Sequence, residues 1–393
     1  MVANAIQTPQ QGREADPLAP RLPRIGLDPL LLLSAVGLGV ISLVAIGGIS
    51  HAQMVRQGVY LGGGLLVMLV VSRFDYSRLR ELKWGLYVIL LGVILVVLAL
   101  GRSIGGISTR SIAVGGFSFQ GSEVAKVLLM VFLAGFVVDS SRKTSSRQLV
   151  SRVILLTLAP TTLVIAEPDL GSALVFIAAA FAVLYIAGVD WRHLTAVFAL
   201  GVAALAIVLV AGPLVGFHTY QADRLTAFLD PGAVPAKKIA SALYQQHESV
   251  IAIGAGEKFG LGHLAPHTAA NFVPLNSTDF IFAALAERFG FAGAAVVLSL
   301  YGLMIWRTLR IIAASKNLFG ALIAAGIVAM LIFQVFVNVG VTEDILPVTG
   351  VTLPLLSYGG SSVLTTFLAL GLLQSIHAQA RIVAATKGRV LSI

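Results

Sequence analysis

The sequence predicts an all-α polytopic membrane protein of about ten transmembrane helices. Hydrophobic residues make up 57% of the 393 residues and charged residues 11%, whereas a soluble domain carries about 25% charged residues. The mean hydropathy is +0.93, and apolar runs recur from residue 28 to residue 380. Because a membrane span needs about 20 apolar residues to cross roughly 30 Å of hydrocarbon, each of these runs is a candidate span.

Ten runs meet this requirement, of which the second is short and the eighth is long. They lie at about 28–50, 58–72, 84–100, 122–138, 150–166, 171–187, 193–213, 279–306, 317–339 and 358–380. Residues 1–24 are polar and rich in proline, lack the pattern of a cleaved signal peptide, and predict a disordered tail. Residues 25–380 then form a single transmembrane domain, followed by a second tail at 381–393.

The positive charges set the expected orientation. Of the 27 Lys and Arg residues, 18 fall in the loops on the side of the termini and seven in the loops on the other side. Basic residues collect in cytoplasmic loops, so both termini are expected in the cytoplasm, with a large outer loop at about 214–278 between spans seven and eight. The net charge of +9 follows from this bias, and we expect no nucleic-acid partner.

Polar residues gather at the outer ends of the expected spans, which predicts a site on that face. Glu123 and Lys126 are three residues apart on a helix and can pair, either to fix helix packing or to line a polar cavity. Asp279 begins the eighth span, where it either caps the helix or serves as a general base at the membrane boundary. The other candidates for substrate or diphosphate binding are Glu167, Asp169, Gln334, Asn338, Ser357 and Ser361.

Several of these residues have more than one interpretation. Glu167 or Asp169 can bind a divalent cation such as Mg²⁺ or Mn²⁺, or Asp169 can cap the sixth span. Three outer arginines that run against the charge bias are candidates for phosphate binding through their planar guanidinium groups, namely Arg102, Arg110 and Arg224. The sequence contains no cysteine, and its histidines show no metal-binding spacing.

Five motifs together resemble the SEDS family (shape, elongation, division and sporulation), typified by RodA and FtsW. They are EPDLGSA, YQADRLTAFLDP, AIGAGEKFGLG, STDFIFAALAERFGF and PVTGVTLPLLSYGGSS, and the YQADRLTAFLDP segment looks more like RodA than FtsW. The resemblance implies a ten-span glycosyltransferase that polymerises lipid II outside the cytoplasmic membrane with a class B penicillin-binding protein. It matches the family's essential carboxylate to Asp279 and its charged pair to Glu123 and Lys126.

The sequence also departs from the family pattern. Gly121 stands where the family has proline, Arg110 lacks the usual Arg-Arg-Trp context, and Glu287-Arg288 replaces a Glu-Glu pair. These departures suggest a divergent lineage and leave Asp279 and the charged pair intact.

The resulting hypothesis is inverting glycosyl transfer, with Asp279 as the base. Arg102, Arg224, Lys126 or a divalent cation would stabilise the diphosphate leaving group. The lipid tails of the substrate would sit in grooves between the spans, and membrane lipids are further expected partners. The alternatives are an FtsW-like division polymerase, a lipid II flippase and a scaffold without chemistry. A flippase needs charges near the midplane, whereas here they crowd the outer edge, which favours the enzyme.

Overall fold

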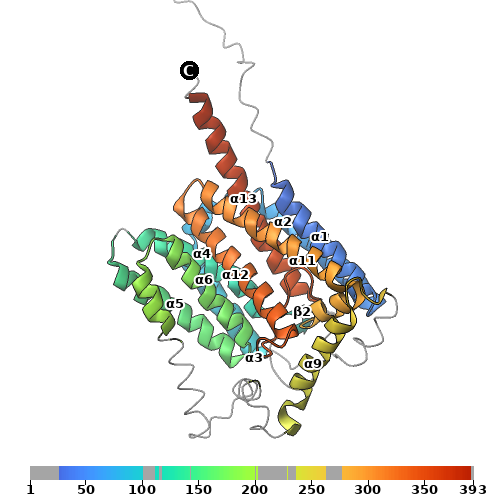
Figure 1. The fold of residues 1–393 in the computed structure, drawn as a ribbon. Helices are drawn as coiled ribbons and strands as arrows, with labels where there is room; N and C mark the ends of the chain where they lie inside the picture. The colour runs from blue at the N-terminus through green and yellow to red at the C-terminus, as the bar shows by residue number, and fades with distance from the viewer. Residues whose placement is uncertain are drawn as a thin grey trace, which may run out of the picture.

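The computed structural model describes residues 26–100, 111–114, 117–141, 143–199, 201, 228, 236–262 and 277–390. The chain forms a bundle of long helices with one small β-hairpin (Figure 1). The helices are α1 (Pro29–Gly47), α2 (His51–Val71), α3 (Lys83–Leu100), α4 (Gly121–Ser140), α5 (Ser146–Ala166), α6 (Leu170–Ile186), α9 (Ala236–Ala255), α11 (Ile281–Ala314), α12 (Leu318–Thr342) and α13 (Gly360–Val390), with a 3₁₀ turn, η1 (Tyr76–Arg80).

The fold class predicted from the sequence is confirmed. Within the described residues, eight helices are long and apolar enough to cross a membrane, and the apolar α6 has 17 residues. The second span is longer than expected, since α2 begins at His51 rather than near residue 58. The expected seventh span, 193–213, lies mostly outside the described residues, as does the tail at 1–24, so the count of ten stays a prediction.

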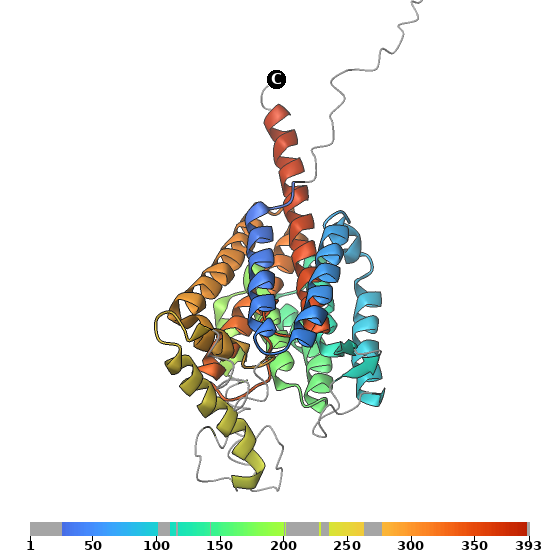
Figure 2. The ribbon, with the colours of Figure 1, turned by 90° about the vertical axis from the view of Figure 1, so that its right-hand side faces the viewer.

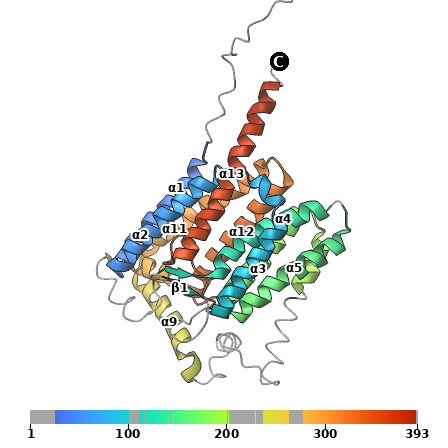
Figure 3. The ribbon, with the colours of Figure 1, turned by 180° about the vertical axis from the view of Figure 1, so that it is seen from behind.

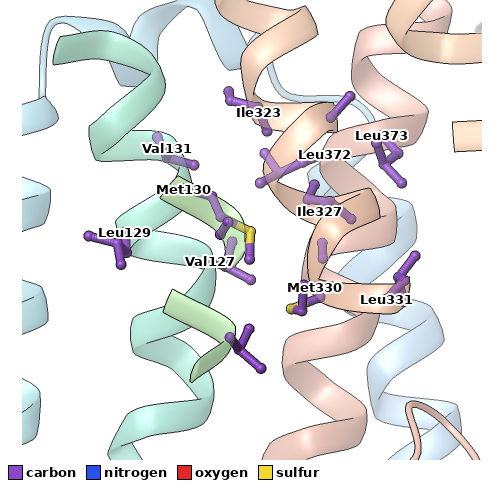
Figure 4. Close-up of a cluster of buried hydrophobic side chains, with 14 of the residues drawn as sticks. Val127, Leu129, Met130, Val131, Ile323, Ile327, Met330, Leu331, Leu372 and Leu373 are labelled. Carbon is purple, nitrogen blue, oxygen red and sulfur yellow. The ribbon is translucent and has the colours of Figure 1, made fainter. Parts of the chain in front are cut away.

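Helices α4, α12 and α13 form the centre of the bundle. Their apolar windows are 83%, 72% and 83% buried, against 17% for α2 and 22% for α3. Val127 and Met130 of α4 face Ile327 and Met330 of α12 (Figure 4). A Cβ at Gly326 would lie 2.8 Å from the Met130 side chain, so α12 presents a small residue where α4 approaches closely, as is common between membrane helices.

The start of α1 is tied to two other helices, α11 and α13. Asp28 caps α1 and accepts hydrogen bonds from Leu31 N (3.0 Å) and Arg307 Nε (2.9 Å), and its own N–H donates to Gln374 Oε1 of α13 (2.7 Å). Burial raises the pKa of Asp28, but the hydrogen bonds from Arg307 and Leu31 outweigh burial and leave this pKa below its usual value. Figure 1 places α9 at the opposite end of the molecule from the end of α13.

A two-stranded antiparallel hairpin, β1 (Ile112–Val114) and β2 (Phe117–Phe119), is an element that the sequence analysis missed. Each strand has only three residues, too few to show an alternating pattern. The Gly-Gly pair between the strands is a hairpin signal and was the available clue.

Helix α11 is broken at Gly290, whereas the sequence analysis expected one continuous span at 279–306. Gly290 has φ 64° and ψ −164°, and the helix resumes and continues to Ala314. The segment after α9 completes the broken hydrogen-bonding pattern, since Phe291 N donates to Glu257 O (2.9 Å) and Leu261 N donates to Glu287 O (2.9 Å). The segment 257–261 is therefore joined to α11 backbone to backbone.

Replacing Gly290 with alanine is expected to destabilise the protein. An added Cβ would clash with the backbone of Phe259 and Gly260, and the positive φ alone costs a residue with a side chain about 1–3 kcal/mol. The melting temperature of detergent-solubilised protein measures the effect. The matched control is Gly302→Ala on the same helix, where a Cβ meets nothing within 4 Å; equal melting temperatures for the two variants would contradict this account.

Candidate functional site at the Asp279 end of the bundle

Asp279 lies in a turn whose backbone is held from outside. The carbonyl groups of residues 277–279 accept three hydrogen bonds in succession, from Tyr358 N (2.8 Å), Ser357 Oγ (2.6 Å) and Asn338 Nδ2 (2.8 Å). Ser357 and Asn338 are 1% and 2% exposed. Two buried side chains and one backbone amide thus fix the path of the chain into α11 and with it the position of Asp279.

The loop between α12 and α13 supplies most of this support and is itself held by four helices. Side chains of α1, α2, α11 and α12 donate to its carbonyl groups: Ser42 to Leu356 (2.7 Å), Gln57 to Ser357 (3.1 Å), Tyr301 to Pro354 (2.7 Å) and Asn338 to Val351 (2.8 Å). Leu353, Leu355 and Leu356 are 0% exposed. Non-helical backbone is tolerated in a membrane bundle only where protein surrounds it in this way or where it lines a water-filled cavity.

Glu123 and Lys126 form the ion pair that their spacing predicts. Lys126 Nζ lies 2.7 Å from Glu123 Oε1, and the two side chains are 2% and 7% exposed for Lys126 and Glu123. They sit in the first turns of α4, so the negative charge lies near the positive end of the helix dipole. Burial makes each charge dependent on the other, because an isolated buried charge is costly.

Asp169 caps α6, which confirms one of its two interpretations. Its Oδ1 accepts from Ser172 N (3.1 Å), and its Oδ2 accepts from Ser122 Oγ (2.8 Å) and Gln120 Nε2 (2.9 Å). Glu167, in the preceding turn, is fully buried. The carboxylate of Asp169 therefore joins α6 to the start of α4, beside the Glu123–Lys126 pair.

Ser361 connects the β-hairpin to the start of α13. Its hydroxyl accepts from Gln120 N (3.1 Å) and donates to Ser118 O (2.8 Å). Gln120 thereby links Ser361 to Asp169, a role that the sequence analysis missed because glutamine is an unusual residue at a helix start. Ser361 is four residues from Ser357, so α13 begins between this network and the Asp279 turn.

The structure brings some expected site residues together and leaves others undescribed. Asn338 and Ser357 meet at the Asp279 turn, whereas Asp169 and Ser361 share the Gln120 network. Their contacts shape the site, and a role for them in substrate binding stays a prediction. Arg102, Arg110 and Arg224 lie outside the described residues.

The remaining sequence-based candidates are Gln334 and a metal site. Gln334 lies one turn before Asn338 on α12 and is 2% exposed, and its side-chain oxygen has no hydrogen-bond partner among the described residues. In the part of the chain that the structure describes, no three His, Asp or Glu side chains are grouped to hold a metal ion.

The fold and the site define a multi-pass membrane protein with a polar site at one end of its bundle, held in place by hydrogen bonds from several helices. The chain belongs to the FtsW/RodA/SpoVE family, whose model, described as "Cell cycle protein", matches residues 27–382. The resemblance found in the sequence motifs is thereby confirmed.

Known relatives cover nearly the whole chain. It is 35% identical to the peptidoglycan glycosyltransferase MrdB of Escherichia coli K12, over 90% of this chain and 94% of that protein. It is 36% identical to a probable peptidoglycan glycosyltransferase FtsW of Thioalkalivibrio sulfidiphilus, over 92% and 90%. Among solved structures, a polymerising and crosslinking peptidoglycan synthase complex matches with a TM-score of 0.76 and 32% identity, over 90% of this chain and 98% of that one.

Asn338→Leu is expected to loosen the Asp279 turn without unfolding the bundle. The change removes the donor to the part-buried carbonyl group of Asp279 and the buried one of Val351, and a buried carbonyl left unsatisfied costs about 1–3 kcal/mol. Hydrogen–deuterium exchange should therefore speed up in peptides covering 277–289 and 351–359. Gln334→Leu is the control, since Gln334 is equally buried on the same helix; similar exchange in both variants would refute the role of Asn338.

Lys126→Met is expected to lower the melting temperature more than the double change Glu123→Gln with Lys126→Met. Removing one partner of a buried ion pair costs about 3–5 kcal/mol, whereas replacing both partners is often neutral. Arg80→Gln serves as the surface comparison, because the Arg80–Asp139 pair is 46% and 31% exposed and such pairs contribute about 0–1 kcal/mol. A double variant as unstable as the single variant would argue against the pair's mutual dependence.

Proposed function

We propose that this protein is a peptidoglycan glycosyltransferase that polymerises lipid II into glycan strands on the outer face of the bacterial cytoplasmic membrane, for cell elongation. Relatives that match 90% of this chain are named peptidoglycan glycosyltransferase. The observation that carries the proposal is the Asp279 turn, which holds one carboxylate at the end of the bundle by three hydrogen bonds to its backbone.

The proposed reaction is an inverting displacement at a sugar carbon. The 4-hydroxyl oxygen of the acceptor attacks the anomeric carbon of the lipid-linked donor, the bond from that carbon to the diphosphate oxygen breaks, and Asp279 takes the hydroxyl proton as general base. The diphosphate leaves as an anion and needs no proton, so a single carboxylate suffices. Rigid positioning matters here, because a base acts only within about 2.6–3.2 Å of the proton-bearing oxygen.

The charge that develops on the diphosphate requires cations nearby. Lys126 is already engaged with Glu123, so its charge is largely neutralised within the protein. Arg102 and Arg224 are the proposed phosphate ligands, with Arg110 a further candidate, and a divalent cation bound to the diphosphate, Mg²⁺ or Mn²⁺, is the remaining proposed source.

The proposed orientation and partner complete this assignment. Arg73, Arg80, Lys83 and Lys143 lie at the opposite end of the bundle from Asp279, and basic residues favour the cytoplasmic side, so both termini are proposed to be cytoplasmic. The proposed partner is a class B penicillin-binding protein. Support comes from the matched synthase structure, which concerns the coordination of polymerization with crosslinking.

Asp279→Asn is expected to abolish polymerisation of labelled lipid II, read as glycan ladders on a gel, while the protein folds normally. Purified protein is assayed with its penicillin-binding partner, before and after EDTA and with Mg²⁺ or Mn²⁺ added back, which tests the cation. Asp344→Asn is the matched control, because Asp344 is an exposed carboxylate at the outer end of α12.

Ladders from the wild type and the control, and none from Asp279→Asn, are the expected result. Ladders from Asp279→Asn at the wild-type rate would exclude Asp279 as the base. If no form of the protein polymerises lipid II with partner and cation present, the glycosyltransferase assignment fails, and lipid II translocation in vesicles becomes the assay for a flippase.

A further inference from the structure

A groove lies along the end of α2 that is remote from Asp279. It has a volume of about 650 Å³ and is lined by Leu66, Leu69, Val70, Arg73, Phe74, Asp75 and Arg78. Gln57, near the start of α2, touches the loop that supports Asp279, and Val70 lies roughly 20 Å further along the helix axis. The groove therefore lies at the opposite end of the bundle from Asp279 and takes no part in the site described above.

One wall of the groove is apolar and faces outward. Leu66, Val70 and Phe74 are 63%, 50% and 66% exposed, and α2 lies on the outside of the bundle against α13 (Figures 2 and 3). Exposed apolar side chains at the end of a transmembrane helix face hydrocarbon rather than water. A soluble ion would leave this wall uncovered, whereas an acyl chain would cover it.

The rim of the groove is positively charged. The side chains of Arg73 and Arg78 are exposed and make no hydrogen bond or ion pair with any residue that the structure describes. Asp75, the acidic group of the lining, accepts hydrogen bonds at Oδ1 from Ser77 N and Gln379 Nε2, both at 2.9 Å. One oxygen of this exposed carboxylate is thus engaged within the protein, and the two guanidinium groups are left for a ligand.

We propose that this groove binds an anionic phospholipid of the adjacent leaflet. An acyl chain lies along Leu66, Val70 and Phe74, and the phosphate lies between Arg73 and Arg78. Guanidinium groups match phosphate oxygens through paired hydrogen bonds, and basic pockets at the cytoplasmic ends of membrane helices are suited to anionic head groups. The net negative charge distinguishes this lipid from a zwitterionic one, which carries a compensating cation.

Native mass spectrometry of the purified full chain tests the proposal. The protein is mixed with phosphatidylglycerol and phosphatidylcholine of identical acyl chains, and bound lipids are counted for three forms: wild type, Arg73→Gln with Arg78→Gln, and Arg147→Gln with Arg152→Gln. The last pair removes the same charge from exposed arginines at the start of α5 that do not line the groove. Phosphatidylglycerol retention should fall about tenfold in the groove variant alone.

Three results would overturn the proposal. They are equal retention by wild type and groove variant, equal loss in both double variants, and retention of phosphatidylcholine as strong as that of phosphatidylglycerol. A further arm adds inorganic phosphate, which should compete weakly; displacement of the lipid at low millimolar phosphate would instead indicate a site for a free anion. Each variant's melting temperature is checked first, and Arg78→Gln alone replaces the double change if that variant does not fold.

Discussion

The structure depends on one constraint, which is that backbone polar groups at membrane depth must find partners inside the protein. Two stretches break helical hydrogen bonding at the Asp279 end of the bundle, the start and kink of α11 and the loop before α13. Each finds its partners in the other parts of the chain. At the kink, Glu257 O accepts a hydrogen bond from the N–H of Phe291. In the loop before α13, side chains of four helices donate hydrogen bonds to the carbonyl groups.

This constraint makes the site a property of the whole bundle rather than of one helix. Ser42 and Gln57 hold the loop that carries Ser357, and Ser357 holds the turn of Asp279. A displacement of α1 or α2 would therefore reach Asp279 through two hydrogen bonds. It also explains why two of the motifs, far apart in the sequence, lie side by side: AIGAGEKFGLG supplies the backbone partners of the broken α11, which begins within STDFIFAALAERFGF.

Local patterns predicted the features that depend on local physics. Apolar runs located the helices, an i,i+3 spacing gave the Glu123–Lys126 pair, and a helix cap was one of the two interpretations given for Asp169. The break at Gly290 could not be predicted in this way, because the residues on both sides are helical and the segment that pairs with them, 257–261, lies about 30 residues earlier in the sequence. The contacts of Asn338 and Ser357 could not be predicted from the sequence for the same reason, because they depend on which carbonyl groups the fold places opposite these side chains.

The two ends of the bundle differ in the interactions that hold their polar groups. At the end with the basic loops, charged pairs such as Arg80–Asp139 and Arg307–Asp28 join helices where water can still reach one partner. At the Asp279 turn, a hydroxyl, a side-chain amide and a backbone N–H donate to three successive backbone carbonyl groups. Because these three bonds use the carbonyl groups of the turn, they fix the path of the backbone without occupying the carboxylate of the proposed base.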